Sequence, residues 1–501
     1  MKKYFCILLA SLMLAGLVSC GKPVPNSNEG LTSDGTNSET GELDPNYVCE
    51  LPTDLTYGGA EVGILYAHAD NREGELISDG PGGDVVSDAV HERNMAVEEQ
   101  LDVHMNMYPA DGDTDVNEKF NQDILGGVGD YDIIVNGTFM AVQPAMEGKY
   151  LNLSVLDNIN TSKHYWTQGY NDMMTFTDDR MQFLASGPIA ISMFRYMYLT
   201  IYNKELFESY QLPDLYETVK DGGWTLDYQY SIVKDHYVDT DGDSKASSGD
   251  FYGFVTGNVI SVDPYLVACD IHMVIKDPDT GDLTYNTSAI KDLSNLCDKI
   301  QLLYHDQSTY VYNGVEQDNI GHDYITQHFA SGKALMATIM FLKMETNYNE
   351  LGAMSYGIAP MPKFSEQQAS YYSYVQNIVS SFGISSVVTD AGRREMCAAV
   401  LESMAYHSNR LIRPAYYETV LSARYMQDPQ SQEVLDMIFD TMYFDFSSSC
   451  CNVFTTCVIR DNLRPLLTST TNNIVSSAKS WKNPVEKHLK EYNKILSGIR
   501  Q

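Results

Sequence analysis

One stretch of the chain, DTDGDSKASSGD at residues 239–250, carries a spacing of carboxylates that suits metal chemistry. Counted from its first residue, acidic side chains fall at positions 1, 3, 5 and 12, which are Asp239, Asp241, Asp243 and Asp250. A hard cation such as Ca²⁺ is held by about six to eight oxygen ligands, which a carboxylate-rich loop can supply. The spacing is compatible with a structural Ca²⁺ at this loop, and a solvated acidic turn is the alternative interpretation.

The spacing of this loop is similar to that of an EF-hand loop, with two departures. Gly242 stands at position 4, whereas Ser244 holds position 6, where a turn glycine is expected. Position 12 is Asp250 in place of the longer Glu. A bound ion would fix the loop and take no part in chemistry.

No catalytic signature accompanies this loop. The sequence contains no G-x-S-x-G, H-E-x-x-H, G-x-x-x-x-G-K-[ST] or G-x-G-x-x-G motif, and the chain is therefore not expected to be an enzyme. The 67 acidic residues leave open a pair of carboxylates that could serve a glycoside hydrolase. No cofactor is expected to be required.

The amino terminus predicts a lipid anchor. Lys2 and Lys3 precede the apolar run YFCILLASLMLAGLV, which is too short for a membrane span of about 20 residues. The sequence LVSC, ending at Cys20, resembles a bacterial lipobox, which implies a signal peptide at 1–19 and lipidation of Cys20. A plain secretory signal that happens to contain a cysteine is the alternative. We expect an extracytoplasmic protein held at the cell membrane.

Residues 20–50 are mostly small, polar or acidic and predict a flexible tether. The whole chain of 501 residues has a net charge of −34, which argues against nucleic acid as a partner. Its 44% hydrophobic content is that of a globular protein. Its length is sufficient for two or more domains.

Seven cysteines follow the anchor, and their spacing matches no zinc site. The odd number leaves at least one thiol free or paired between chains. Buried, reduced thiols are the favoured interpretation. The segment from Cys450 and Cys451 to Cys457 has room for one bridge, which the sequence alone does not establish.

The pattern after the tether is that of a parallel α/β sheet. Strands are predicted at 61–69, 102–109 and 131–137, and apolar stripes between them predict helices. Alternation of strand and helix favours a sheet covered by helices. A second α/β region begins near Gly187, and the chain is mostly helical from about residue 390.

Several phrases in this order resemble the extracellular solute-binding proteins of ABC importers, the family that includes maltose-binding protein. They are DAVHERNMAVEEQL, YDIIVNGTF, EGKYLNL, IYNKELFE, GGWTLD, FYGF, SGKALM and YGIAPMPK, and they span about residues 60–390. The resemblance implies a periplasmic-binding-protein-like fold with two discontinuous α/β lobes and a ligand cleft between them. It places lobe 1 at 51–185 and 338–385, and lobe 2 at 186–337 and 386–501.

Three hinge segments are expected from the same resemblance, at MQFLASGP, KALMATIM and SSFGISS. Closure of the lobes would be the signal that a membrane permease reads. We expect an oligosaccharide as the leading ligand class and a monomeric protein as the binding unit. A surface glycan-binding lipoprotein without a transporter, or an anchored glycoside hydrolase, is the alternative.

Sugar recognition by such a cleft uses aromatic faces and hydrogen-bonding groups, and open α/β sheets place ligands at the carboxyl ends of their strands. The candidate ligand-binding residues are His68, Thr138, Phe139, Trp166, Trp224, Phe341, Tyr371 and Tyr372. Each has a structural alternative, because an aromatic or hydroxyl side chain at the start of a helix or in a half-buried strand often packs in the core.

Overall fold

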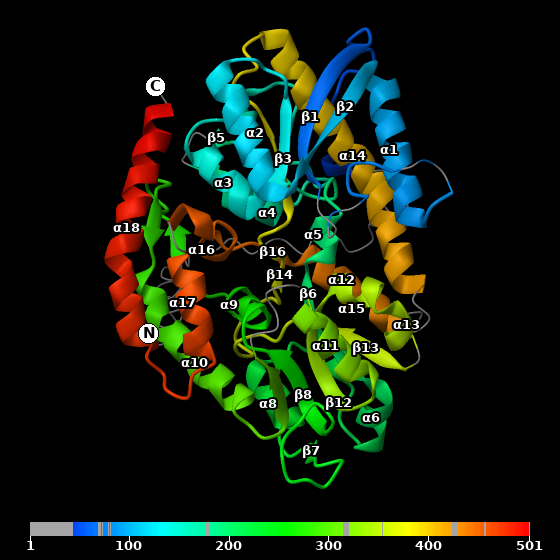
Figure 1. The fold of residues 1–501 in the computed structure, drawn as a ribbon, viewed down its shortest axis with the longest axis vertical. Coiled ribbons are helices and arrows are strands. Elements are labelled where there is room, and N and C mark those ends of the chain that lie inside the picture. The colour runs from blue at the N-terminus through cyan, green and yellow to red at the C-terminus, as the bar shows by residue number, and fades with distance from the viewer. Residues whose placement is uncertain are drawn as a thin grey trace, which may run out of the picture.

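The computed structural model describes residues 44–499 except 69–71, 73, 79, 81, 177–180, 314–319, 353, 423–428 and 455–456. The predicted signal peptide, Cys20 and most of the predicted tether lie outside the described residues. The remaining chain forms two α/β lobes with crossing segments between them (Figure 1).

The first lobe is built on a four-stranded sheet in the order β15-β3-β1-β2. Its strands are β1 (Ala60–His68), β2 (Val103–Asp111), β3 (Ile133–Gly137) and β15 (Ser380–Ile384). The first three are mutually parallel, and β15 runs antiparallel to β3. The intervening helices are α1 (Val85–Leu101), α2 (Gly112–Gly126) and α3 (Thr138–Met146). The predicted strand–helix alternation is confirmed.

Local sequence explains the boundaries of α1. The Asp84 carboxylate accepts hydrogen bonds from the amides of Val86 and Ser87, both at 2.9 Å, and so caps the first turn. The helix ends at Asp102, whose φ of 49° places it in the left-handed region. The buried face of α1 packs against the long helix α14 (Ala391–Ser422), which therefore belongs to the first lobe.

The second lobe contains a sheet in the order β11-β8-β12-β6-β13, with β7 added beside β8. Its strands are β6 (Tyr198–Asn203), β7 (Tyr237–Val238), β8 (Phe251–Gly257), β11 (Thr309–Tyr312), β12 (Ala334–Met340) and β13 (Tyr356–Ala359). Strands β8, β11 and β12 are parallel, whereas β6 runs antiparallel to its neighbours β12 and β13. The helices around it are α6 (Lys204–Ser209), α7 (Leu215–Lys220), α8 (Leu226–Val233), α11 (Ile320–Ala330), α12 (Phe341–Thr346), α13 (Tyr348–Leu351) and α15 (Pro429–Asp440).

Short elements complete the fold around these two sheets. They are α4 (Gln168–Met174), β4 (Thr175–Phe176), β5 (Met181–Gln182), α9 (Asp263–Ala268), β9 (Val274–Lys276), β10 (Leu283–Tyr285), α10 (Ile290–Tyr304), α16 (Phe446–Ser449), α17 (Val458–Leu467) and α18 (Ile474–Ile499). Helix α18 lies along one edge of the molecule in Figure 1. None of the described helices combines the length and apolar character that a bilayer span requires.

Three crossing segments join the lobes. The first runs from Ala185, which is bridged to Phe382, through α5 (Ser192–Arg195) into β6. The second runs from β14 (Ser373–Tyr374) to β15. The third contains β16 (Met442–Tyr443), which pairs in parallel with β14 near the middle of the molecule (Figure 1).

Two of the predicted boundaries differ from the structure. The segment KALMATIM is β12 within the second sheet and not a hinge, and β13 also pairs in that sheet, so 338–359 does not belong to lobe 1. Helix α14 packs on α1, so the boundary at 386 is also wrong. A buried central strand and an apolar crossing strand have the same sequence pattern, which is why the sequence did not separate them.

Candidate functional site

The carboxyl ends of the parallel strands in both sheets face the crossing segments. In the first lobe, the amides of Thr138 and Phe139 donate to the carbonyls of Val379 and Asn377 in the second crossing, at 2.9 and 3.0 Å. In the second lobe, the Phe341 amide donates to Met197 at the start of β6, at 3.1 Å. We call the space between these two strand edges the interlobe region. Open α/β sheets bind ligands at such edges.

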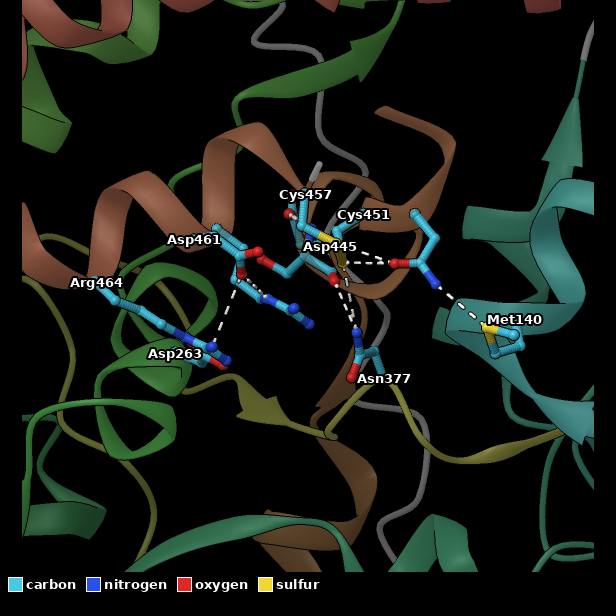
Figure 2. Close-up of a disulfide and its surroundings, with 11 residues drawn as sticks. Met140, Asp263, Asn377, Asp445, Cys451, Cys457, Asp461 and Arg464 are labelled. Carbon is cyan, nitrogen blue, oxygen red and sulfur yellow. Dashed lines mark hydrogen bonds and ion pairs between the residues drawn. A yellow bond between two sulfur atoms is a disulfide. The ribbon is translucent and has the colours of Figure 1, made fainter. Parts of the chain in front are cut away.

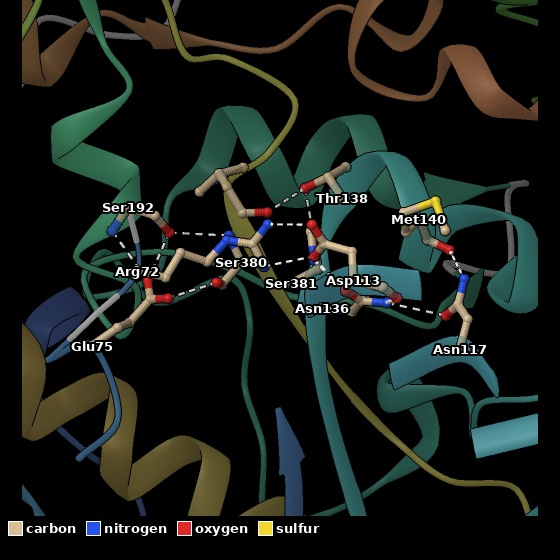
Figure 3. Close-up of polar contacts among 12 residues, drawn as sticks. Arg72, Glu75, Asp113, Asn117, Asn136, Thr138, Met140, Ser192, Ser380 and Ser381 are labelled. Atoms are coloured by element: carbon tan, nitrogen blue, oxygen red, sulfur yellow. Dashed lines mark hydrogen bonds and ion pairs between the residues drawn. The ribbon is translucent and has the colours of Figure 1, made fainter. Parts of the chain in front are cut away.

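A buried ion pair lies at the first of these edges (Figure 3). The guanidinium of Arg72 donates to both oxygens of Asp113, at 2.7 and 2.8 Å. The side chains are 3% and 18% exposed, so the carboxylate keeps contact with solvent. Burial acts to lower the pKa of Arg72, but the charge of Asp113 outweighs it and the pKa is raised. The two charges therefore neutralise each other in a fixed geometry, and Asp113 is the more exposed member of the pair.

Glu75 connects two crossing segments beside this ion pair (Figure 3). Its carboxylate accepts from the amide and hydroxyl of Ser192, at 3.0 and 2.6 Å, and from the hydroxyl of Ser380, at 2.6 Å. Ser192 begins α5 in the first crossing, and Ser380 begins β15 at the end of the second. Glu75 is 3% exposed, so its role is to hold the crossings together.

The opposite edge presents a second ion pair and two amides. Arg464 of α17 donates to both oxygens of Asp263 at the start of α9, with the Nε–Oδ1 bond at 2.7 Å. The side-chain amide of Asn258, after β8, donates to the side-chain oxygen of Asn313, after β11, at 2.9 Å. Both asparagines retain solvent exposure. This edge therefore offers hydrogen-bonding groups without a net charge.

A disulfide between Cys451 and Cys457 precedes α17 (Figure 2). Asn377 of the second crossing lies beside it and donates to the Ser448 carbonyl at 3.4 Å. The disulfide lies in the segment for which the sequence allowed one bridge without establishing it. Cys49, Cys269, Cys297, Cys397 and Cys450 are free thiols, and all but Cys49 are buried.

Four of the predicted ligand-binding aromatic residues lie in the core. Trp166 is 2% exposed and donates to Glu402 at 3.0 Å, and Trp224 is fully buried and donates to the Pro360 carbonyl at 2.8 Å. Phe341 is fully buried, and Tyr371 is 6% exposed. The prediction that these four rings contact the ligand is therefore wrong for this conformation, because a ring packed in the core has no free face for a solute.

The remaining predicted residues have different surroundings. Thr138 is fully buried, and its hydroxyl bonds Val379 and Ser381 (Figure 3), so it fixes the start of α3. His68 is exposed at the carboxyl end of β1. Phe139 and Tyr372 are half-buried and lie beside the second crossing. Of the predicted set, Phe139, Tyr372 and His68 keep an accessible surface.

The acidic loop lies between β7 and β8, away from the crossing segments. Asp239, Asp241 and Asp243 place carboxylate oxygens within 4.8 Å of one another. Asp250 does not join them, because its buried carboxylate accepts from the amides of Thr240 and Ser247, both at 2.9 Å. The calcium site stays a prediction, now with three converging carboxylates and Asp250 as a loop brace.

The sequence did not predict a role for Arg72, Glu75, Asp113 or the Asp263–Arg464 pair. Arg72 and Asp113 follow the first two strands, so their positions after strand ends were a usable signal. Their pairing across 41 residues, and that of Asp263 with Arg464 across 201, could not be read from local sequence.

Comparison with known proteins gives the fold a context. No family model matches the chain, and no curated protein matches it. The chain is similar in structure to a sugar transporter from Rhizobium etli in an open conformation, with a TM-score of 0.57 and 13% identity over 85% of this chain and 99% of that one. It is similar to the galacto-N-biose-/lacto-N-biose I-binding protein of the ABC transporter from Bifidobacterium longum, with a TM-score of 0.54 and 12% identity over 87% and 98% of the two chains.

A third similar structure is the maltose/maltodextrin-binding domain MalE from Bdellovibrio bacteriovorus bound to maltotriose. Its TM-score is 0.51, with 15% identity over 86% of this chain and 100% of that chain. At such identities the likeness establishes architecture. The chain has the two-lobed, periplasmic-binding-protein-like α/β fold of these three structures.

Proposed function

We propose that this protein captures a small solute between its two lobes and delivers it, without chemical change, to an ABC permease. The observation that carries the proposal is the facing of both carboxyl edges across three crossing segments. The full-length similarity to sugar-binding proteins of this architecture supports it. Lipidation at Cys20 would hold the protein outside the cytoplasm, at the membrane that contains the permease.

The groups at the interlobe region favour a neutral, hydroxyl-rich ligand, with an oligosaccharide as the first candidate. Arg72 and Asp113 neutralise each other, as do Asp263 and Arg464. Such pairs offer directional hydrogen bonds and no net charge that would select an ion. Phe139 adds an aromatic surface of the kind that packs on sugar C–H faces.

A thermal-shift screen tests the proposal with the chain from residue 21, which retains every described residue. Neutral glycans of two to six sugar units, free amino acids and short peptides are the ligands to compare. A solute that binds only the folded form raises the midpoint of unfolding. A response to glycans supports the proposal, whereas a response to peptides alone overturns the ligand class.

Two further measurements separate this function from its alternatives. Small-angle scattering with and without the best ligand reports lobe closure, and binding without compaction would favour an adhesion protein. A reducing-sugar assay on the same sample detects hydrolysis. Release of new reducing ends would contradict the proposal and favour an anchored glycoside hydrolase.

A further inference from the structure

The carboxyl-terminal helix α18 carries a row of basic side chains on an otherwise acidic protein. Its 26 residues hold five lysines against two glutamates, whereas the whole chain has 67 acidic and 33 basic residues. Lys479, Lys487, Lys490 and Lys494 fall within an arc of roughly 80° at 3.6 residues per turn. They form a stripe about 22 Å long, which we call the lysine stripe.

The lysine stripe is exposed, and its side chains form no ion pairs with the described carboxylates. All four side chains are exposed, and among the described residues none has a carboxylate within salt-bridge distance. The two glutamates of α18 lie close to other side chains, Glu486 to Lys482 at 3.7 Å and Glu491 to His488 at 3.8 Å. Other lysines of the chain, such as Lys119 and Lys163, are in ion pairs of 2.6–2.7 Å.

The opposite face of α18 holds the stripe rigidly. Buried residues on that face are Ile474, Ala478, Trp481, Val485, Leu489 and Leu496. The Asn493 side chain exchanges two hydrogen bonds of 3.0 Å with the backbone of Leu283, and the Tyr492 hydroxyl donates to Val453 at 3.0 Å. In Figure 1, α18 lies at the outer edge of the molecule. Its exposed lysine face is opposite to its buried face.

We propose that the lysine stripe is a docking surface for anionic lipid headgroups of the membrane that carries the anchor. Positive charge in a row suits a plane of phosphates, and each lysine near such a surface strengthens binding about fivefold. Because the Debye length is about 8 Å at physiological salt, the negative charge of the rest of the protein is largely screened at the stripe, where four lysines outnumber the neighbouring Glu486 and Glu491. This inference rests on the proposed membrane location but not on solute capture.

The tether has the length to permit this contact. About 24 positions separate Cys20 from Asp44, where the described structure begins, and a random coil of that length would have a typical span of roughly 25–30 Å. The body can therefore turn the outer face of α18 toward the bilayer. The consequence is a preferred orientation in place of free rotation about the anchor.

Vesicle cosedimentation tests the proposal with the unlipidated chain from residue 21. Vesicles of phosphatidylcholine are compared with vesicles that contain about 30% phosphatidylglycerol, at low and high salt. We expect binding to the anionic vesicles alone, weakened by salt. The triple variant K487Q/K490Q/K494Q should lose roughly a hundredfold in affinity.

The matched control K220Q/K234Q/K245Q removes the same charge from exposed lysines of the second lobe. It should bind within about twofold of the unmodified chain, since those lysines lie outside the stripe. Thermal unfolding checks that both variants fold. Absence of binding to anionic vesicles, or equal loss in both variants, overturns the proposal. If the triple variant K487Q/K490Q/K494Q binds vesicles as the unmodified chain does but impairs solute uptake in cells, the proposal is also overturned. The stripe would then be assigned to contact with an acidic protein surface. Glycan-induced thermal shifts are measured separately, so failure of solute capture remains distinguishable.

Discussion

Phe139 is an aromatic side chain that the structure leaves half-buried at the interlobe region. Its backbone amide is fixed by the Asn377 carbonyl in the second crossing, so the ring sits on a rigid support at the start of α3. Asp113 lies at the same strand edge, and its side chain is 18% exposed. An aromatic face beside a hydrogen-bond acceptor is the arrangement that suits one sugar unit.

Replacing Phe139 by Ala should weaken the best glycan ligand about fivefold or more, because a ring contact contributes about 1 kcal/mol. Isothermal titration calorimetry measures the change. The control is Leu125→Ala, which truncates an apolar side chain that is 88% exposed at the far end of α2. Equal affinity of both variants would remove Phe139 from the binding surface.

His272 is held between two carboxylates next to the third crossing. One ring nitrogen lies 3.1 Å from Asp445 and the other 2.9 Å from Asp270. Burial acts to lower the pKa of His272, but the hydrogen bonds to the two aspartates dominate and raise it to about 9.

The raised pKa predicts pH-dependent stability. Protonated His272 stabilises the fold fully below about pH 6.5, and this contribution of roughly 3 kcal/mol is lost as the pH rises through about 9. In urea unfolding, His272→Gln should lack this loss between pH 6.5 and pH 9.5. The exposed His104→Gln on β2 is the control and should follow the unmodified chain. A parallel pH response of all three proteins would contradict the assignment.

At the scale of single elements, Trp224 fastens the turn before α8 to the segment after β13. The Lys363 amide donates to the Trp224 carbonyl at 3.1 Å, and the Leu226 amide donates to the Lys363 carbonyl at 2.9 Å. The indole is fully buried and reaches Pro360. This tryptophan stabilises the second lobe and does not present a platform to the ligand.

Trp224→Ala should lower the free energy of unfolding by about 3–5 kcal/mol, because it leaves a large cavity and an unpaired carbonyl. Trp224→Phe should cost less, and Val238→Ala, at a half-exposed site, should be nearly neutral. Denaturant unfolding provides the values. If folded Trp224→Ala protein instead loses glycan affinity while keeping its stability, the assignment to the core is wrong.

The acidic loop between β7 and β8 makes a separate prediction. With three converging carboxylates, millimolar CaCl₂ should raise the midpoint of thermal unfolding, whereas equal MgCl₂ should have less effect, because Mg²⁺ demands stricter geometry. The variant D239N/D241N/D243N should abolish the response. Exposed Asp279 and Asp54 provide the control substitutions. A calcium response that survives in the triple variant would assign the ion elsewhere.

At the scale of the whole molecule, solute capture depends on where the body is held. Lipidation of Cys20 predicts that the protein fractionates with membranes although none of its described helices suits a bilayer span. Cys20→Ser should release the protein from the membrane fraction while glycan affinity is retained. Cys6→Ser, within the apolar run of the predicted signal, is the matched control and should remain anchored. Retention of Cys20→Ser in the membrane would refute lipidation at that position.

The architecture of the molecule was accessible from sequence because helix and strand periodicity are local properties. The apolar stripe of α1 and the buried strands β1 and β3 were predicted near their observed positions, and their order implied a parallel α/β sheet. The ordered phrases then implied two lobes, which the structure confirms. The cap of α8 is local in the same way, since the Thr225 hydroxyl accepts a hydrogen bond from the Tyr228 amide.

Tertiary structure alone decided which side chains face the interlobe region. Trp166 and Trp224 look like ligand platforms in sequence, but neighbours distant in the chain enclose them, Glu402 in one case and Pro360 in the other. The pairing of Arg72 with Asp113 likewise joins loops that only the strand order β1-β2 brings together. Local pattern fixes which elements form, whereas burial and charge neutralisation depend on contacts between distant segments, which a single sequence does not specify.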